Sequence, residues 1–304
     1  MFQNSVSFAE KDFIIKGIES NIRLDGRSQL DYRPLYIETS NLPNAHGSSR
    51  VRQQDGTDLI VGIKAETSNV DLNSPSPNKG KLICSIECAP NSNLQFRGRT
   101  QEEINTELTQ LFQKMLDYPG CGVDLESLLV IENQTCWHLY IDVLVLGWSG
   151  SLVDCISVGI RAALANTKLP KVIVHPPVEG VTEFEIIDDN ELTNSLKGWE
   201  DIPLIVSLNK IGEKYVVDAT LVEEGCAQGK VMVGVNKSGR VALVQKVGRG
   251  AIDLGMVSEM VETGKKLALV NLGKMDERLA SEKAETEALR KKGNQVSPLG
   301  FLAH

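Results

Sequence analysis

The sequence has no Cys-x-x-Cys pair, although it contains six cysteines in 304 residues. It has no apolar run near the roughly 20 residues of a membrane-spanning helix, and its longest run, residues 139–146, is interrupted by Asp142. The first 12 residues hold neither a basic nor an apolar segment, so they predict no secretory signal. These absences exclude the usual zinc-finger spacing, and they predict a soluble, intracellular protein with buried free thiols.

Negative charge is concentrated in one segment. The formal net charge is −8, and residues 179–201, with eight acidic side chains and Lys197, carry −7 of it. The rest of the chain is therefore almost neutral, and the acidic pI of about 5.2 does not exclude a polyanionic partner. We expect this acidic segment to be a linker or an edge segment.

Hydrophobic periodicity predicts strands and helices in an order that occurs twice. The first half has a helix at 10–19, a capping-box match at Thr100 that opens a helix over 100–116, and a helix from Ser151, with strands at 35–39, 47–54, 58–66, 81–88, 128–132 and 137–146. Asp55-Gly56 is a signal for a two-residue hairpin, and residues 67–78 are expected to form a loop. The second half has a helix from Asp253 and strands at 204–208, 215–220, 230–235 and 240–245.

This pattern predicts an α+β chain with two related halves, built from mixed sheets with packed helices. We expect an N-terminal helix and arm over 1–29, a first domain over 30–195 and a second domain over 196–272. A charged C-terminal tail over 273–304 completes the division. Its helical part, from Lys274, has an apolar face that is too thin for a core, so it is expected to be solvated or to depend on a partner.

An arginine-rich turn follows the first helix. Asp25-Gly26 is a turn pair, and Arg23, Arg27 and Arg33 flank it as planar cations suited to phosphates or carboxylates. A capped turn held by salt bridges and an anion-binding cluster are both open from the residues alone.

A second turn precedes the helix that begins at Ser151. Its residues Ser149, Gly150 and Ser151 form a glycine-serine turn at a helix N-terminus, which is a geometry that can hold an anion. Plain capping of the helix by the Ser151 side chain is an equal alternative, because no arginine accompanies the turn in the sequence.

The order of these pieces resembles the RNase PH family and, more narrowly, the RNase PH-like ring subunits of the eukaryotic exosome that lack catalytic acids. The matching segments are 24–27, 31–33, 47–51, 57–66, 137–145, 149–154, 162–167, 216–224 and 245–250. Each segment alone is weak, but their shared order covers almost all of residues 10–270. The resemblance implies a two-domain RNase PH-like fold.

Active members of that family use phosphate to attack the last phosphodiester of RNA, and two acidic residues hold a divalent metal for this step. Aligned on Glu223-Glu224, those two positions are Gly225 and Val231 here, and neither side chain can bind a metal. The resemblance therefore implies a pseudoenzyme with no catalytic residues, no metal and no cofactor.

The same resemblance suggests where RNA would pass. In the archaeal ring, arginines of the helix here spanning 100–116 face RNA, and the corresponding positions are near Gln110 and Lys114. The nearest basic candidates before that helix are Arg97 and Arg99. Contact with RNA phosphates and simple solvation are equally open for these side chains.

We therefore hypothesise a non-catalytic structural subunit of the exosome core ring, which supports 3′-to-5′ RNA processing and degradation, including rRNA maturation. The implied partners are other RNase PH-like subunits, cap proteins and RNA in the ring channel, with no membrane, in the nucleus, nucleolus and cytoplasm. Trp148 and Trp199, in or beside loops, also indicate surface hidden in a hetero-oligomer. The alternative is an active phosphorolytic 3′-to-5′ exoribonuclease, and the missing acids favour the structural role.

Overall fold

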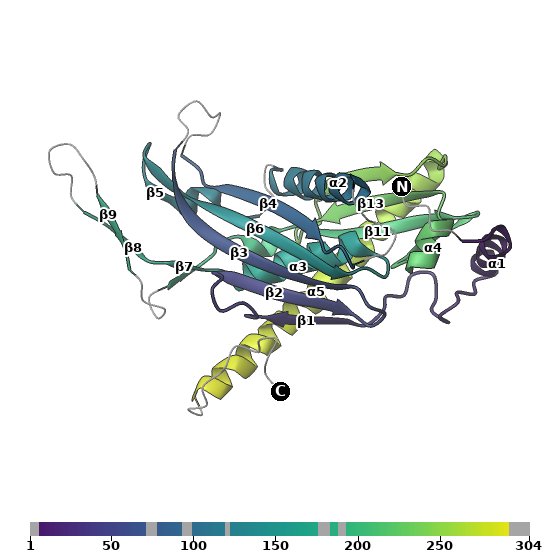
Figure 1. The fold of residues 1–304 in the computed structure, drawn as a ribbon, viewed down its shortest axis with the longest axis horizontal. Coiled ribbons are helices and arrows are strands. Elements are labelled where there is room, and N and C mark those ends of the chain that lie inside the picture. The colour runs from purple at the N-terminus through teal and green to yellow at the C-terminus, as the bar shows by residue number, and fades with distance from the viewer. Residues whose placement is uncertain are drawn as a thin grey trace.

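Two β-sheets with helices packed on them make up most of the described chain (Figure 1). The computed structural model describes residues 6–70, 78–92, 99–118, 122–175, 183–187 and 193–291. The larger sheet has the order β1-β2-β3-β6-β4, with β5 also paired to β6, and the smaller has the order β12-β11-β13-β14. In the larger sheet β4 runs parallel to β6, whereas the other pairs are antiparallel. The predicted α+β class with mixed sheets is confirmed.

The strands of the larger sheet are β1 (Leu35–Thr39), β2 (Gly47–Gln53), β3 (Asp58–Asn69), β4 (Lys81–Cys88), β5 (Leu129–Ile131) and β6 (Thr135–Gly147). Those of the smaller sheet are β11 (Leu204–Ile211), β12 (Lys214–Val217), β13 (Gly229–Val235) and β14 (Val241–Val247). Strands β5 and β6, which correspond to the predicted strands 128–132 and 137–146, pair as an antiparallel hairpin, and the short 3₁₀ helix η1 (Leu125–Leu128) precedes them.

Two short ribbons lie between the sheets in sequence. In them β7 (Lys168–Pro170) pairs with β10 (Thr193–Ser195), and β8 (Val172–Val174) pairs with β9 (Phe184–Ile186). The described parts of the acidic segment 179–201 thus include β9, β10 and the 3₁₀ helix η2 (Trp199–Asp201). Strands β9 and β10 each form one edge of a two-stranded ribbon, which agrees with the prediction of an edge segment.

Helix α3 (Leu152–Ala165) lies between the two sheets. It packs against β2 and β3 on one side and against β11 on the other, and all but one of its 14 residues are buried. Gly159 permits the close approach, because a Cβ atom there would lie 2.8 Å from Leu59 and 2.9 Å from Val61. The buried residues are therefore not confined to one apolar stripe, because a helix held between two sheets is covered on all sides.

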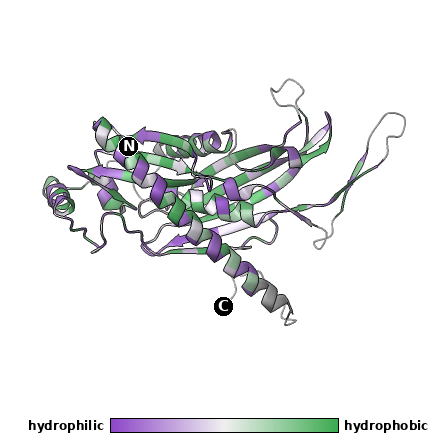
Figure 2. Ribbon diagram, turned by 180° about the vertical axis from the view of Figure 1, so that it is seen from behind, coloured by the Kyte–Doolittle hydropathy of each residue, from purple (hydrophilic) through white to green (hydrophobic). Residues whose placement is uncertain are grey.

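Helices α1 (Phe8–Glu19), α2 (Arg99–Leu116), α4 (Leu221–Cys226) and α5 (Leu254–Lys291) lie on the outside of the two sheets. Helix α2 packs on β4, and α1 packs against α4 and the smaller sheet. Helix α5 contacts β11 and β13 and then continues past the smaller sheet (Figure 1). Seen from behind in Figure 2, α5 runs across the molecule with hydrophilic and hydrophobic residues alternating along it.

The prediction of a thin, solvated helix from Lys274 is wrong. Helix α5 passes through residue 273 without a break, and Met275 and Leu279 are buried against Ala162 and Ala165 of α3. Two apolar residues one turn apart on a helix suffice here because the facing residues on α3 are small. The domain boundaries drawn from the sequence stay a prediction.

Three local expectations also differ from the structure. The loop between β2 and β3 has four residues, 54–57, instead of two, and β3 extends to Asn69 into the segment predicted as loop. Strand β12 ends at Val217, and Thr220 caps the unpredicted helix α4 through a capping box with Glu223. Helix α2 begins at Arg99, one residue before the predicted position.

The cysteines fit the expectation of buried thiols. Cys84, Cys88, Cys136, Cys155 and Cys226 are all free and buried, and the sixth cysteine lies outside the described residues. Along the described part of the chain, no helix has both the length and the apolar character needed to cross a membrane.

Candidate functional site

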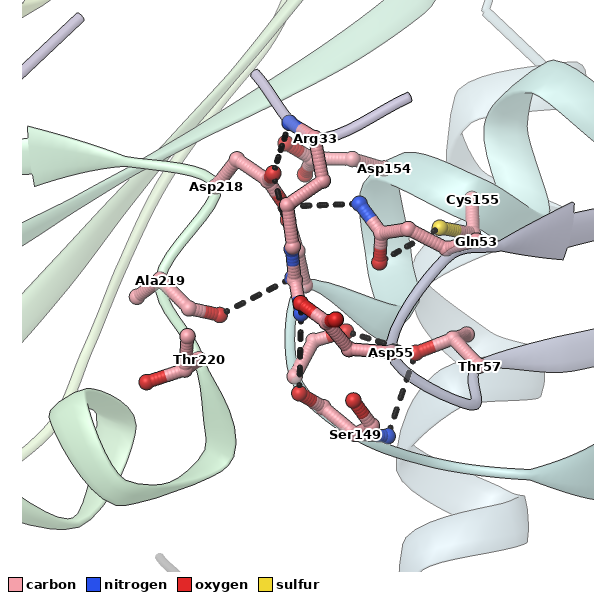
Figure 3. Close-up of polar contacts among 12 residues, drawn as sticks. Arg33, Gln53, Asp55, Thr57, Ser149, Asp154, Cys155, Asp218, Ala219 and Thr220 are labelled. Atoms are coloured by element: carbon pink, nitrogen blue, oxygen red, sulfur yellow. Dashed lines mark hydrogen bonds and ion pairs between the residues drawn. The ribbon is translucent and has the colours of Figure 1, made fainter. Parts of the chain in front are cut away.

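Asp218 joins three separate segments of the chain (Figure 3). Its Oδ1 accepts hydrogen bonds from Arg33 Nη2 at 2.7 Å and from Gln53 Nε2 at 2.9 Å. Its Oδ2 accepts from Arg33 Nε at 3.0 Å, from the Arg33 backbone N–H at 2.7 Å and from Arg27 Nη1 at 2.8 Å. The carboxylate thus links the N-terminal arm, β2 and the end of β12.

Arg23 makes a second buried pair beside the first. Its Nε donates to Glu223 Oε1 at 3.0 Å, and its Nη2 donates to Glu223 Oε2 at 2.7 Å. Nη2 also donates to the Asp218 carbonyl oxygen at 3.0 Å. Arg23, Arg27 and Arg33 therefore all bind carboxylates of the second half. Of the two alternatives for this turn, an anion-binding cluster and a turn held by salt bridges, the structure supports the salt bridges.

The electrostatics of Asp218 reflect these partners. Burial by itself would raise the pKa of this carboxyl, but the hydrogen bonds and charge of Arg33, with a further bond from Gln53, outweigh it and hold the pKa below the ordinary value. Asp218 is therefore ionised at neutral pH and fully engaged, so it is not free to hold a metal.

The glycine-serine turn lies directly against this cluster (Figure 3). The Ser149 N–H donates to Thr57 Oγ1 at 3.1 Å, and the Ser149 carbonyl oxygen accepts from Arg33 Nη1 at 3.2 Å. Gly150 has φ +110°, and a Cβ atom there would collide with the carbonyl oxygen of Ala219. The turn is thus a contact between the two halves, and an arginine does accompany it, from 116 residues away in the sequence.

Ser151 does not cap α3 with its side chain. Its backbone is left-handed, with φ 48° and ψ 37°, and no side-chain capping hydrogen bond forms. Its N–H instead donates to Glu224 Oε1 at 3.3 Å, and its buried Oγ has no partner among the described residues. The capping alternative is therefore wrong, and a carboxylate of the chain itself lies at the turn where an anion was expected.

The two positions aligned with catalytic acids lie in the second half. Gly225 is in α4 and lines a cavity of about 120 Å³ against α2 and the start of α3, whereas Val231 is fully buried in the core of the smaller sheet. Glu224 and Lys230 line the same cavity, and Lys230 Nζ lies 2.5 Å from Glu224 Oε1. Among the described residues that line this cavity, the carboxylates are Glu224 and Glu107 of α2, and Lys230 pairs with the first of them.

Asn209 is a polar residue of this cavity that the sequence did not single out. It is fully buried in β11 beside Lys230 of β13, and neither atom of its amide has a hydrogen-bond partner among the described residues. Its one sequence signal is a polar residue inside an apolar strand. Buried amides are normally satisfied, so a water molecule at this position is expected.

In the described ranges, no contact joins the candidate RNA-contacting residues to the cluster around Asp218. Arg97 lies outside the described residues, and Arg99 is the first residue of α2, with its side chain also outside the described part. Lys114 is exposed in the last turn of α2. Within the described ranges, no three His, Cys, Asp or Glu side chains form a group that could hold a metal ion.

Comparison with known proteins places these features in a family. The sequence model of the 3′ exoribonuclease family (RNase PH), domain 1, matches residues 31–170, and that of domain 2 matches residues 201–266. A protein of Dictyostelium discoideum named "Putative exosome complex exonuclease RRP42" is 30% identical over 319 residues, covering 90% of this chain and 98% of its own. "Exosome complex component Rrp42" of Thermococcus kodakarensis is 33% identical over 84% of this chain and 90% of its own.

Solved structures show the same fold. A chain of the structure titled "Archaeal exosome core" matches with a TM-score of 0.69 at 24% identity, covering 88% of this chain and 96% of its own. A chain of the "archaeoglobus fulgidus exosome with RNA bound to the active site" matches with a TM-score of 0.71 at 24% identity. With both domain models matched in order along the sequence, this chain belongs to the 3′ exoribonuclease (RNase PH) family.

Proposed function

We propose that this chain is a non-catalytic structural subunit of an RNA exosome core ring. The observation that carries the proposal is the pair Gly225 and Val231, which stand where active relatives are expected to hold two acids. Metal-assisted phosphorolysis needs carboxylate ligands beside the scissile phosphate, and a glycine and a buried valine supply none. The similarity to proteins named Rrp42 over 84–90% of the chain supports the same role.

The surroundings of Gly225 also support a structural role. Glu224 accepts a hydrogen bond from the Ser151 N–H and pairs with Lys230, so the charge of the Glu224 carboxylate is neutralised within the chain. An incoming phosphate at the Ser149–Ser151 turn would meet this carboxylate. We infer that, once Glu224 moves away, the turn binds an anion through the N–H groups at the start of α3.

The proposal includes partners and place. In this proposal the chain assembles with other RNase PH-like subunits and with cap proteins around a channel. RNA passes through this channel to sites of 3′-to-5′ processing and degradation, which include rRNA maturation. Arg97, Arg99 and Lys114 are the proposed contacts to RNA phosphates. The nucleus, nucleolus and cytoplasm are the expected compartments.

The deciding experiment measures phosphorolysis by the purified full-length chain. RNA with a free 3′ end, magnesium and inorganic phosphate are supplied, and nucleoside diphosphate release is followed. We expect no release above background. Phosphate-dependent release that Glu224→Gln abolishes, while Glu126→Gln on the exposed part of η1 leaves it intact, would instead establish the alternative of an active exoribonuclease.

A further inference from the structure

A second cavity, of about 430 Å³, lies where β1 and the residues just before it, α3, β11 and α5 meet. Its lining shares no residue with the cavity at Gly225. Its walls are mainly apolar, with side chains from all of these elements, among them Pro34, Leu35, Val158, Leu204 and Met275. A concave, mostly apolar cavity of this size with a few polar groups is the usual form of a small-molecule site.

Polar atoms without partners line this cavity. Ser151 Oγ and Asp154 Oδ1 are buried, with residue exposures of 1% and 8%, and neither has a hydrogen-bond partner among the described residues. Tyr32 Oη is buried as well, and the Asn271 side chain is its hydrogen-bonding neighbour within the chain. Two unpartnered atoms on one cavity call for an explanation, because buried polar groups are normally hydrogen-bonded.

Asp154 is the charged member of this set. Its Oδ2 accepts from the Ser207 N–H at 3.1 Å, which leaves Oδ1 as the free acceptor. Burial raises the pKa of Asp154 to about 6, although the Ser207 bonds work against the rise. A buried carboxyl oxygen without a hydrogen-bond partner is an acceptor that a hydroxyl group of a ligand can satisfy.

Two cations lie at the other side of the cavity. Lys274 and Arg278 line it from α5, one helical turn apart, and both are exposed. Neither has a carboxylate within 4.0 Å in the described part of the chain, whereas the nearby Asp276 is paired with Arg161 and Lys237. A lysine and an arginine at this spacing suit a phosphate group.

We propose that this cavity binds a small phosphorylated sugar, free or as a nucleoside monophosphate. The sugar hydroxyls donate to Asp154 Oδ1 and bond the Ser151 and Tyr32 hydroxyls, and the phosphate lies between Lys274 and Arg278. Acceptors and donors thus match at both ends of one molecule. The proposal needs neither ring assembly nor RNA, so it stands apart from the proposed function.

The test is isothermal titration of the full-length chain with adenosine monophosphate, ribose 5-phosphate and inorganic phosphate. We expect both sugar phosphates to bind at least tenfold more tightly than inorganic phosphate. Binding of adenosine monophosphate but not ribose 5-phosphate assigns the nucleotide as the ligand, and binding of both assigns the shared sugar phosphate.

Two variants locate the site. Tyr32→Phe removes only a hydroxyl, whose neighbour within the chain is the Asn271 side chain, so the melting temperature should change little while the affinity falls about tenfold, the equivalent of about 1.4 kcal/mol. The exposed double variant Lys274→Glu with Arg278→Glu should reduce affinity by more than tenfold. Lys266→Glu, on an exposed part of the same helix, is the control and should change nothing.

Three results would overturn the proposal. No heat with any probe at millimolar concentration, on protein shown to be folded, would mean that the cavity holds water only. Equal binding of inorganic phosphate, unaffected by Tyr32→Phe, would mean a surface anion patch. Sugar phosphate binding that neither variant changes would place the site elsewhere.

Discussion

Arg33 and Asp218 face each other across the junction of the two halves of the molecule, joined by two side-chain hydrogen bonds of 2.7 and 3.0 Å. They are 185 residues apart in the sequence, and both are at least 95% buried. A bidentate pair of this kind fixes orientation as well as distance. The pair therefore sets how the N-terminal arm and β12 lie against each other.

Removing the charge of Asp218 should destabilise the protein strongly. Asp218→Asn removes the buried counter-charge of Arg33 and leaves Arg27, among the described residues, with Asp25 alone, which costs about 3–5 kcal/mol of unfolding free energy. Chemical denaturation of the full-length chain measures this loss. Asp55→Asn is the control, because Asp55 is 49% exposed and lies 3.6 Å from Arg33. Equal losses for the two variants would contradict the central role of Asp218.

The pH dependence of this pair has a defined sign. The folded pKa of Asp218 lies below its ordinary value of 3.8, so the unfolded chain binds the proton more readily. Its contribution to stability is present above that ordinary value and is lost as the pH falls through the folded pKa. The difference between the parent and Asp218→Asn should therefore stay constant from pH 5 to 8 and shrink only in acid.

Asp154 should behave in the opposite way. Its folded pKa of about 6 exceeds the ordinary 3.8, so its favourable contribution is present below pH 3.8 and lost as the pH rises through 6. Asp154→Asn should therefore be more stable than the parent by about 1–3 kcal/mol at pH 7.5, with little difference near pH 4. Urea unfolding at both pH values checks this, and a variant that is less stable at both would refute it.

Gly150 tests the contact between the halves. Gly150→Ala combines an unfavourable positive φ with a collision against Ala219, so we expect a loss of about 3 kcal/mol or more. Gly26→Ala is a matched control, because Gly26 has φ +75° but nothing within 4 Å of an added Cβ. That control should cost about 1–2 kcal/mol. Similar melting temperatures for the two variants would show that the close approach adds nothing.

Assembly is the prediction that follows from the proposed function. Trp148 is buried within the chain and Trp199 is half-buried under Arg161, so neither tryptophan marks an interface as the sequence suggested. The exposed apolar side chains of α1, with Phe8 89% and Phe13 66% exposed, are the surface that we expect a partner to cover. The tagged chain should co-purify with several RNase PH-like subunits, as mass spectrometry would show. A stable monomer in cell extract would contradict this.

RNA contact can be tested in the assembled ring. Arg97→Glu with Arg99→Glu should lower cross-linking of RNA, and the remaining cross-linking should fall steeply with salt, because phosphate contacts release counterions. Lys114→Glu tests the third candidate separately. Lys266→Glu on α5 controls for the change in net charge. Unchanged cross-linking in the double variant would assign both arginines to the solvated surface.

Local patterns explain which parts of the molecule the sequence predicted. The alternation in β3 and the turn at Asp25-Gly26, where Arg27 Nε bonds Asp25 Oδ2 at 2.7 Å, depend on neighbours a few residues away. The partners of the same arginine turn, Asp218 and Glu223, lie about 190 residues further on, and no local pattern pairs them. Gly225 and Val231 were identified only through the alignment with the family on Glu223-Glu224, because no local pattern marks these two positions.

The remaining differences also have tertiary causes. Ser151 adopts a left-handed backbone because its N–H turns towards Glu224 of the other half, which no propensity encodes. The strand predicted over 215–220 ends at Val217, and the capping box of Thr220 with the buried Glu223 then opens helix α4, which the sequence pattern did not predict. Met275 and Leu279 look too few for a core until Ala162 and Ala165 face them.

The position of α5 has a consequence for synthesis of the protein. Arg161 of α3 is fully buried, and its carboxylate partner Asp276 is on α5, 115 residues later in the chain. Residues 31–170 can collapse early, but α3 then carries an uncompensated guanidinium and uncovered alanines until more than 100 further residues have been translated. A nascent chain that stalls before Asp276 should therefore expose an unpaired guanidinium and apolar surface, the kind of surface that chaperones bind.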